Sequence, residues 1–173
     1  MSNPDSELRG HPAAIGSRLA RRPDSCIAPP SSACLLAQSI RIYLEDTDAG
    51  GIVYHASWLR FFERARTDWL RDLGIEQSTF GPDSGIGFVV RDLQISFIRP
   101  GQLDQRVRTE LRLLEVRRAS LSLLQQAFDD STGIELVGAR VRIAALRLTD
   151  QRAAPMPAAL LDKLVAHRAS TDA

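Results

Sequence analysis

The segment from Glu45 to His55 brings together side chains that can do chemistry. It reads Glu-Asp-Thr-Asp-Ala-Gly-Gly-Ile-Val-Tyr-His, so it holds three carboxylates, two adjacent glycines and a Tyr-His pair. A carboxylate in such a place can act as a general base or as a nucleophile. Backbone amides at the start of a following helix can stabilise an oxyanion, because they are unpaired donors at the positive end of the helix dipole. The segment is therefore predicted to be a site rather than a linker.

Each residue of this segment has a chemical and a structural interpretation. Asp48 is the candidate base or nucleophile, and its alternative is an N-cap or Asx-turn carboxylate. His55 is the one histidine of the predicted folded core, where it orients water, holds Asp48, or serves as a cap or satisfied polar group. Tyr54 either packs or contacts a substrate. Gly50 and Gly51 let the backbone turn tightly and approach a ligand without an intervening side chain.

Two apolar elements flank the segment and must hold it in place. Residues 38–44 alternate as a strand does, with Ile42 and Leu44 on one face. Apolar residues at helical spacing predict a long helix from Ser57 to Leu73, which Gly74 ends as a C-cap. Both tryptophans of the chain lie on this helix, so its buried stripe is bulky. It is predicted to be the central helix of the domain.

The rest of the chain predicts a sheet. A loop from Ser78 to Gly85 leads into strands that can form an antiparallel meander, and a short amphipathic helix follows at 158–167. The strand patterns cover residues 86–99, 106–115, 119–128 and 135–148. One curved sheet around one apolar helix is the expected α+β architecture, because the sheet has one strongly apolar face. Domains of this plan usually dimerise by extending the sheet.

Composition restricts the classes of function. Lys and Arg number 22 against 21 Asp and Glu, so no overall field indicates nucleic acid or an anionic membrane. Both cysteines, Cys26 and Cys34, precede the first predicted strand, which excludes a disulfide scaffold, a Cys-based metal site and a Cys nucleophile from the folded part. No apolar run has the length of a membrane-spanning helix and no secretory signal is evident, so a cytoplasmic location is expected.

The predicted domain boundaries follow from these patterns. Residues 1–37 are rich in Pro, Ser, Ala and Arg and are expected to be a disordered, non-catalytic extension. Residues 38–168 form the domain, and 169–173 form a C-terminal tail.

The central motif also carries a family resemblance. Arg-Ile-Tyr-Leu-Glu-Asp-Thr-Asp-Ala-Gly-Gly-Ile-Val-Tyr-His-Ala-Ser-Trp, followed by Phe-Phe-Glu-Arg-Ala-Arg-Thr, covers residues 41–58 and 61–67. It resembles the hotdog-fold acyl-CoA thioesterases of the 4-hydroxybenzoyl-CoA thioesterase group, and most of all the YbgC-type branch associated with the Tol-Pal envelope system. The likeness extends from about Ser39 to Leu164, and the N-terminal extension lies outside the family pattern.

The resemblance implies a hotdog fold, with a five-stranded antiparallel sheet wrapped around a central helix, assembled as a homodimer or homotetramer. It implies hydrolysis of acyl thioesters of coenzyme A or acyl carrier protein to the free acid and the thiol, at a site on a subunit interface. No metal or redox cofactor is implied, since coenzyme A or phosphopantetheine enters as part of the substrate.

The family's functional positions can be placed on this sequence. Its aspartate matches Asp48, and its oxyanion-binding amide matches the neighbourhood of Tyr54 and His55. Its phosphate-binding surface matches Arg117 and Arg118 in the turn between the third and fourth strands, where exposed turn residues are the alternative.

Two other interpretations stay open. Glu63 on the central helix stands where another hotdog branch has a catalytic carboxylate, and a salt bridge with a neighbouring arginine is its structural role. The rival functions are a non-catalytic adaptor for acyl carrier protein or for lipid-synthesis and envelope proteins, and a hotdog dehydratase or isomerase.

Overall fold

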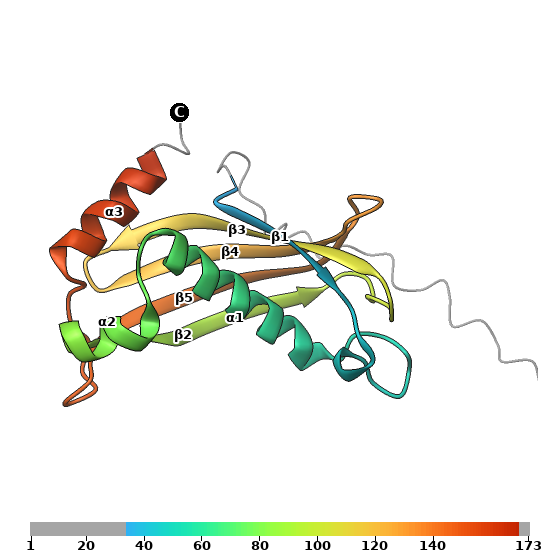
Figure 1. Cartoon of the computed structure of the whole chain (residues 1–173), viewed down its shortest axis with the longest axis horizontal. Coiled ribbons are helices and arrows are strands. Elements are labelled where there is room, and N and C mark those ends of the chain that lie inside the picture. Colours follow the sequence, from blue (N-terminus) through green and yellow to red (C-terminus); the bar gives the residue numbers. More distant parts are fainter. Residues whose placement is uncertain (1–33, 170–173) are drawn as a thin grey trace, which may run out of the picture.

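A computed structural model describes residues 34–169 as one five-stranded antiparallel sheet with a long helix across it (Figure 1). This confirms the predicted α+β class and the sheet wrapped around a central helix. The strands are β1 (Leu36–Arg41), β2 (Ile86–Phe97), β3 (Arg106–Arg117), β4 (Ser120–Asp129) and β5 (Glu135–Arg147). The helices are α1 (His55–Asp72), α2 (Gln77–Ser84) and α3 (Ala158–Ala169), with a 3-10 turn, η1, at Leu44–Asp46.

The strand order is β1-β3-β4-β5-β2, which corrects the predicted meander of four consecutive strands. Only β3, β4 and β5 follow one another in space, whereas β2 pairs with β5 from Ile86 opposite Arg147 to Phe97 opposite Val137. The physical reason is the central helix, because α1 carries the chain across the sheet before β2 begins (Figure 1). The strand β2 therefore forms one free edge of the sheet, and the shorter β1 forms the other.

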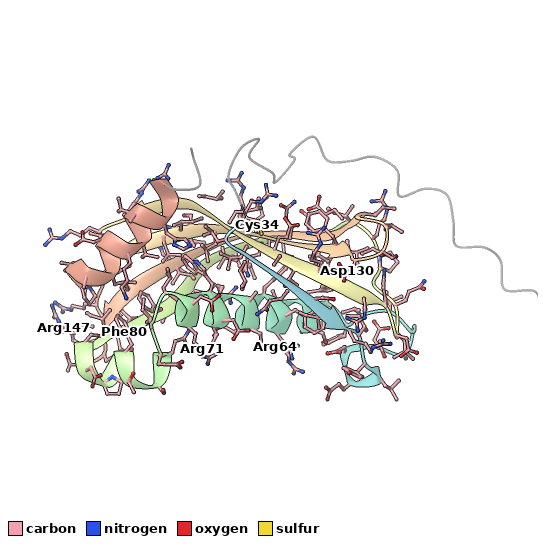
Figure 2. All side chains as sticks on the ribbon, turned by 45° about the horizontal axis from the view of Figure 1, so that its top comes forward. Cys34, Arg64, Arg71, Phe80, Asp130 and Arg147 are labelled. Carbon is pink, nitrogen blue, oxygen red and sulfur yellow. The ribbon has the colours of Figure 1, made fainter. Side chains whose placement is uncertain are left out.

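Helix α1 presents one bulky apolar stripe to the sheet. Trp58, Phe61, Phe62 and Trp69 are all buried, and burying each such side chain contributes about 1.5–3 kcal/mol. Charged side chains such as Arg64 lie on the side of the helix away from the sheet (Figure 2). The helix starts two residues before the predicted start. Its C-cap is Leu73, and Gly74, the predicted C-cap, follows it in the left-handed conformation at φ +74° that ends such helices.

Two local predictions are corrected by long-range contacts. The first strand ends at Arg41, so Ile42 is buried while Leu44, expected on the same face, is 75% exposed in η1. The predicted loop at 78–85 contains α2, because Phe80 stacks on Phe88 of β2 with ring centroids 5.5 Å apart. The contact stabilises α2 in a helical conformation, although the Gly-Pro pair within α2 has a low helix propensity.

The predicted N-terminal extension lies almost wholly outside the described residues, and β1 starts at Leu36, inside its last positions. Most of the predicted C-terminal tail also lies outside them, while α3 continues to Ala169. Between residues 34 and 169, no helix combines the length and apolar character needed to cross a membrane.

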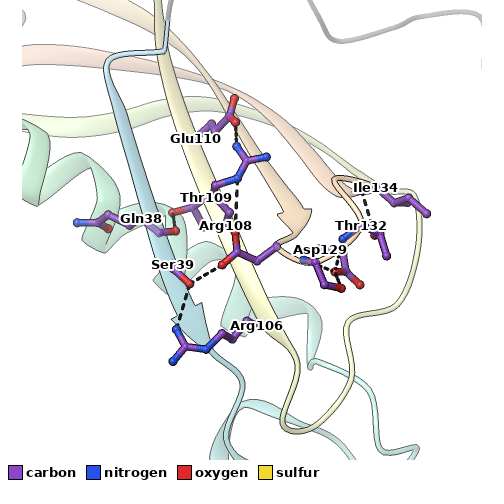
Figure 3. Close-up of polar contacts among 11 residues, drawn as sticks. Gln38, Ser39, Arg106, Arg108, Thr109, Glu110, Asp129, Thr132 and Ile134 are labelled. Atoms are coloured by element: carbon purple, nitrogen blue, oxygen red, sulfur yellow. Dashed lines mark hydrogen bonds and ion pairs between the residues drawn. The ribbon is translucent and has the colours of Figure 1, made fainter.

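The turn between β4 and β5 is built around one carboxylate (Figure 3). Asp129 accepts hydrogen bonds from the Ser131 hydroxyl at 2.6 Å, the Ser131 amide at 2.8 Å and the Thr132 amide at 3.1 Å. Its other oxygen accepts one from Gln105 Nε2 at 2.6 Å. These donors, the Ser131 side chain first, lower the pKa of Asp129 from 3.8 to about 2.

We expect this turn to make folding acid-sensitive. Because the pKa of Asp129 is lower in the folded chain, its stabilisation is complete above its ordinary pKa of 3.8 and is lost as the pH falls towards about 2. In urea unfolding between pH 6 and pH 2.5, Asp129→Asn should flatten this part of the pH dependence. Asp83→Asn, in an exposed position of α2, should not. Equal slopes for Asp129→Asn and wild type would contradict the expectation.

Candidate active site

Asp48 lies exposed at the tip of a tight loop between η1 and α1. Its Oδ1 accepts a hydrogen bond from the Gly50 amide at 2.8 Å, and its backbone carbonyl accepts one from Gly51 at 3.0 Å. Gly51 has φ +74°, a conformation that glycine adopts without strain. The loop closes where the Asp48 amide donates to the Ile52 carbonyl at 2.9 Å. Asp48 thus forms the Asx-type turn that was the structural alternative for this residue, and its Oδ2 remains available to solvent or substrate.

The first turn of α1 follows this loop directly. Tyr54 is the N-cap and provides no capping side-chain hydrogen bond, and its carbonyl accepts the Ser57 amide at 2.8 Å. The amides of His55 and Ala56 lie too near the start of the helix to have an intrahelical acceptor. No capping side chain from the N-cap residue binds them either. Two backbone donors at the positive end of a helix dipole therefore lie a few residues from the Asp48 carboxylate.

The loop is anchored from both sides. Asp46 is buried and its Oδ2 accepts the Tyr43 amide at 2.9 Å, so this carboxylate holds the turn. The Tyr54 amide donates to the Asp46 carbonyl at 2.8 Å, and the Val53 amide donates to Gly101 at 2.9 Å. These bonds tie the segment to the connection between β2 and β3. The sequence showed Gly101 only as part of a Pro-Gly turn.

We expect Gly101→Ala to loosen this anchor. A Cβ atom at Gly101 would lie 2.9 Å from the Trp58 ring and 3.0 Å from a Val53 methyl carbon, so one of them must move. Overpacking of this kind costs about 1–3 kcal/mol of unfolding free energy. Gly81→Ala is the matched control, because its nearest contact is an ordinary 3.5 Å and alanine favours its helix. Urea denaturation should show opposite signs for the two changes, and equal stabilities would refute this explanation of Gly101.

His55 and Tyr54 lie together at the start of the helix. Their rings contact each other with centroids 4.2 Å apart and tilted by 57°, and both residues are exposed. Within residues 34–169, no hydrogen bond joins His55 to Asp48, so the loop holds the carboxylate through Gly50 instead. The predicted roles of His55 and Tyr54 in catalysis or substrate contact stay predictions.

Glu63 forms the salt bridge that its structural interpretation predicted. It pairs with Arg66, whose Nη1 donates to Gln125 Oε1 at 2.6 Å. Gln125 is fully buried on β4 and its Nε2 donates to the Phe62 carbonyl at 2.8 Å. This network joins the middle of α1 to the sheet. The roles of Arg66 and Gln125 were not predicted from the sequence, although a glutamine at an inward-facing position of an apolar strand was a signal for Gln125.

Arg117 and Arg118 lie at the β3–β4 turn, as predicted. The start of β3 adjoins the active-site loop, where Gln105 accepts the Ile42 amide at 2.9 Å. Arg117 lies eleven residues beyond Arg106, about 36 Å along the strand. One chain therefore does not bring these arginines beside Asp48. Arg117 pairs with Glu115 at 2.8 Å.

No group of three or more His, Cys, Asp or Glu side chains in the described part of the chain is placed to hold a metal ion. The arrangement that remains is an exposed carboxylate, a glycine turn and free amides at a helix N-terminus. Such a set can attack an acyl carbon, or activate water to do so, and can bind the resulting oxyanion.

Comparison with known proteins supports the same chemistry. The thioesterase-like superfamily matches residues 42–164. The "Acyl-CoA thioesterase YbgC" of Haemophilus influenzae is 39% identical over 118 residues, which cover 68% of this chain and 85% of that protein. The "Acyl-CoA thioester hydrolase YbgC" of Escherichia coli is 39% identical over 87 residues, which cover 50% of this chain and 64% of that protein.

A solved structure agrees with these relatives. The crystal structure of a probable thioesterase from Bartonella henselae superimposes with a TM-score of 0.65 and 33% identity. The match covers 72% of this chain and all of that one.

Proposed function

Because the chain belongs to the thioesterase-like superfamily and is a thioester hydrolase, we propose that it cleaves acyl-CoA to the free acid and the coenzyme A thiol, with Asp48 as the attacking or water-activating carboxylate. The observation that carries the proposal is the exposed Asp48 held by Gly50 immediately before the free amides of His55 and Ala56. An acyl carrier protein thioester has the same reacting group, so the phosphopantetheine form of the substrate enters the same proposal.

The two roles of Asp48 place different atoms in the product. As a base, Asp48 removes a proton from water, and the water oxygen enters the acid in the first turnover. As a nucleophile, Asp48 attacks the acyl carbon, the C–S bond breaks, and the coenzyme A thiolate leaves an acyl-carboxylate anhydride. When water then attacks the carboxyl carbon of Asp48, the solvent oxygen stays in Asp48. After a single turnover in ¹⁸O water, solvent oxygen found in Asp48 by mass spectrometry of the protein identifies Asp48 as the nucleophile.

We place the active site at a dimer interface along β2. Val89, Val90 and Leu93 on this edge strand are between 41% and 49% exposed. An unpaired edge with apolar side chains favours pairing with another strand. In a two-fold dimer, β2 would pair with the same strand of a second copy in antiparallel orientation. Sedimentation equilibrium should then give a dimer or a multiple of it, as the predicted homodimer or homotetramer requires.

The same symmetry supports the proposed role of Arg117 and Arg118. Antiparallel pairing along β2 reverses the second copy, so its active-site loop moves towards the end of the sheet that carries the β3–β4 turn. The two arginines would then face a substrate held by Asp48 of the other subunit. Arg118 forms no ion pair with the described residues and is the freer phosphate ligand, whereas Arg117 already pairs with Glu115.

A thiol-release assay over short to long acyl-CoA and acyl carrier protein thioesters tests the proposal. Hydrolysis that saturates with one class of substrate would support it. Binding of acyl carrier protein without thiol release from any substrate would favour the adaptor, and a modified acyl group still attached to coenzyme A would favour the dehydratase or isomerase. A cytoplasmic location and an association with the Tol-Pal system stay predictions from the resemblance.

A further inference from the structure

A polar groove crosses the face of the sheet that is turned away from α1. Its volume is about 310 Å³, and side chains from β2, β3, β4 and β5 line it. On β5, Val141 and Ile143 are buried in the core under α1, so Arg142 between them points to the opposite face. A single water needs roughly 10–15 Å³ measured in this way, so the groove has room for about twenty non-hydrogen atoms.

Two β-bulges lie on either side of this groove. One interrupts the pairing of β2 with β5 just before Asp92, and the other interrupts the pairing of β3 with β4 just before Glu115. Both bulges fall in one row of strand partners across the sheet, which runs Asp92, Arg142, Ser122 and Glu115. Bulges change the direction of side chains and are frequent beside functional sites. The bulge of β3 makes Leu114 one wall of the groove, and the short side chain of Ser122 leaves space beside it.

Three side chains offer hydrogen-bond donors to this space. Arg142 is half-buried, yet within residues 34–169 its guanidinium forms no ion pair or hydrogen bond. The side chains of Gln94 and Ser122 also line the groove and find no hydrogen-bond partner in the same part of the chain. A guanidinium, an amide and a hydroxyl therefore face one groove with their donors unused. Such a set suits an oxyanion, because hydrogen bonds from a guanidinium to a phosphate or carboxylate are strong.

The acids around the groove do not cancel its positive charge. Glu115 already pairs with Arg117 at 2.8 Å. Asp92 stands at the rim, where it pairs loosely with Arg91 at 3.7 Å, and the two side chains are 64% and 63% exposed. Arg140 also lines the groove, so a second guanidinium lies near Arg142. The excess of arginine over free carboxylate favours a negatively charged ligand.

We propose that this groove binds a nucleoside monophosphate whose phosphate is held by Arg142 and Arg140. The planar guanidinium matches phosphate oxygens in a bidentate manner. Leu114 gives the base an apolar surface, and Asp92 at the rim can accept hydrogen bonds from ribose hydroxyls, as carboxylates do in other nucleotide sites. A free phosphate ion would fill only a small part of the volume.

The groove is separate from the proposed active site. Asp48 precedes α1, and α1 covers the other face of the sheet (Figure 1). A dimer paired through β2 would use the backbone groups of that edge, so the side chains of Asp92 and Gln94 would stay on the outer face. The inference therefore goes beyond the proposed hydrolysis and does not depend on it.

Isothermal titration calorimetry of the full chain with AMP, adenosine and inorganic phosphate tests the site. AMP should bind once per chain, and adenosine and phosphate should each bind at least about ten-fold more weakly, because each lacks part of the contacts. Arg142→Gln should weaken AMP binding about ten-fold or more, the ratio that a charge-assisted hydrogen bond supplies. Ser122→Leu keeps both arginines but fills the groove, and it should weaken AMP binding as well.

Arg106→Gln is the matched control for the loss of charge. Arg106 is an exposed arginine on the same face of the sheet, at the start of β3, and it does not line the groove. Its replacement should leave AMP binding within about two-fold of wild type, because it lies outside the proposed contacts. Equal effects of Arg106→Gln and Arg142→Gln would show a general response to charge and overturn the site.

Arg118→Gln separates the groove from the substrate site, since Arg118 is the proposed phosphate ligand of coenzyme A. We expect Arg118→Gln to bind AMP as wild type does, and Arg142→Gln to keep the wild-type KM for acyl-CoA. Loss of AMP binding in Arg118→Gln with retention in Arg142→Gln would place AMP in the substrate site and refute the inference.

Two further outcomes would overturn the inference. One is that wild type binds no AMP up to about 1 mM, or binds phosphate as tightly as AMP. The other is that Arg142→Gln breaks a tetramer into dimers in sedimentation while wild type binds no AMP, because the groove is then an interface between copies. The titrations do not use thiol release, so failure of the proposed hydrolysis would leave their result readable.

Discussion

Replacing Asp48 with Asn is expected to lower kcat/KM for acyl-CoA hydrolysis by at least about 10²-fold. Asparagine keeps an oxygen that can accept the Gly50 amide at the position of Oδ1, so the loop should keep its shape. It can neither take a proton from water nor attack the acyl carbon as a carboxylate. Loss of a positioned general base costs about 10²–10⁴ in rate, and loss of a nucleophile costs at least as much.

The control for this change is Glu45→Gln. Glu45 is an exposed carboxylate of the same segment, three residues before Asp48. The chemical change is the same, yet hydrolysis should stay within about two-fold of wild type. Circular dichroism and sedimentation should show both variants folded and assembled. Comparable activities for Asp48→Asn and Glu45→Gln would remove Asp48 from the reaction and return it to a purely structural turn.

Gln125→Leu is expected to cost about 2–4 kcal/mol of unfolding free energy. Leucine has a similar volume, but it removes the acceptor of the Arg66 guanidinium and the donor to the Phe62 carbonyl in one step. Arg66 is 9% exposed and Gln125 is fully buried, so water cannot replace the lost bonds without opening the core. Breaking one side of a buried charged network is more destabilising than losing a surface contact, because a buried charge remains poorly compensated.

Gln126→Leu provides the comparison at the next position of the same strand. Gln126 points to the other face of the sheet, where its Nε2 donates to Glu135 at 2.9 Å. Loss of that single hydrogen bond should lower the free energy of unfolding by only about 1 kcal/mol. Urea denaturation of both variants measures the difference. If Gln125→Leu is no less stable than Gln126→Leu, the network through Arg66 does not hold α1 on the sheet.

Glu63 and Arg66 of this network also line a cavity between α1, β2 and α3. Arg66 is held on one side by Glu63 and on the other by Gln125. The same bonds fix the helix that carries Trp69.

The local order of residues was sufficient to predict much of the protein. The motif around Asp48 indicated the family and the carboxylate, because its loop and the helix start depend on neighbours only a few residues apart. Helix α1 followed from the spacing of its apolar side chains, and Gly74 ended it through a left-handed conformation that glycine favours. The alternation of apolar and polar residues indicated the strands for the same reason.

Contacts between distant residues decided the rest. Periodicity shows which face of β2 is apolar but not which strand it joins, and only the folded chain places it beside β5. The burial of Ile42 and the exposure of Leu44, and the helix α2 where a loop was predicted, depend on what packs against them. The partners of Arg66, the unpaired indole of Trp69 and the distance between Asp48 and Arg117 likewise require the tertiary structure. Each joins segments far apart in the sequence, and no local pattern of residue types specifies such a pairing.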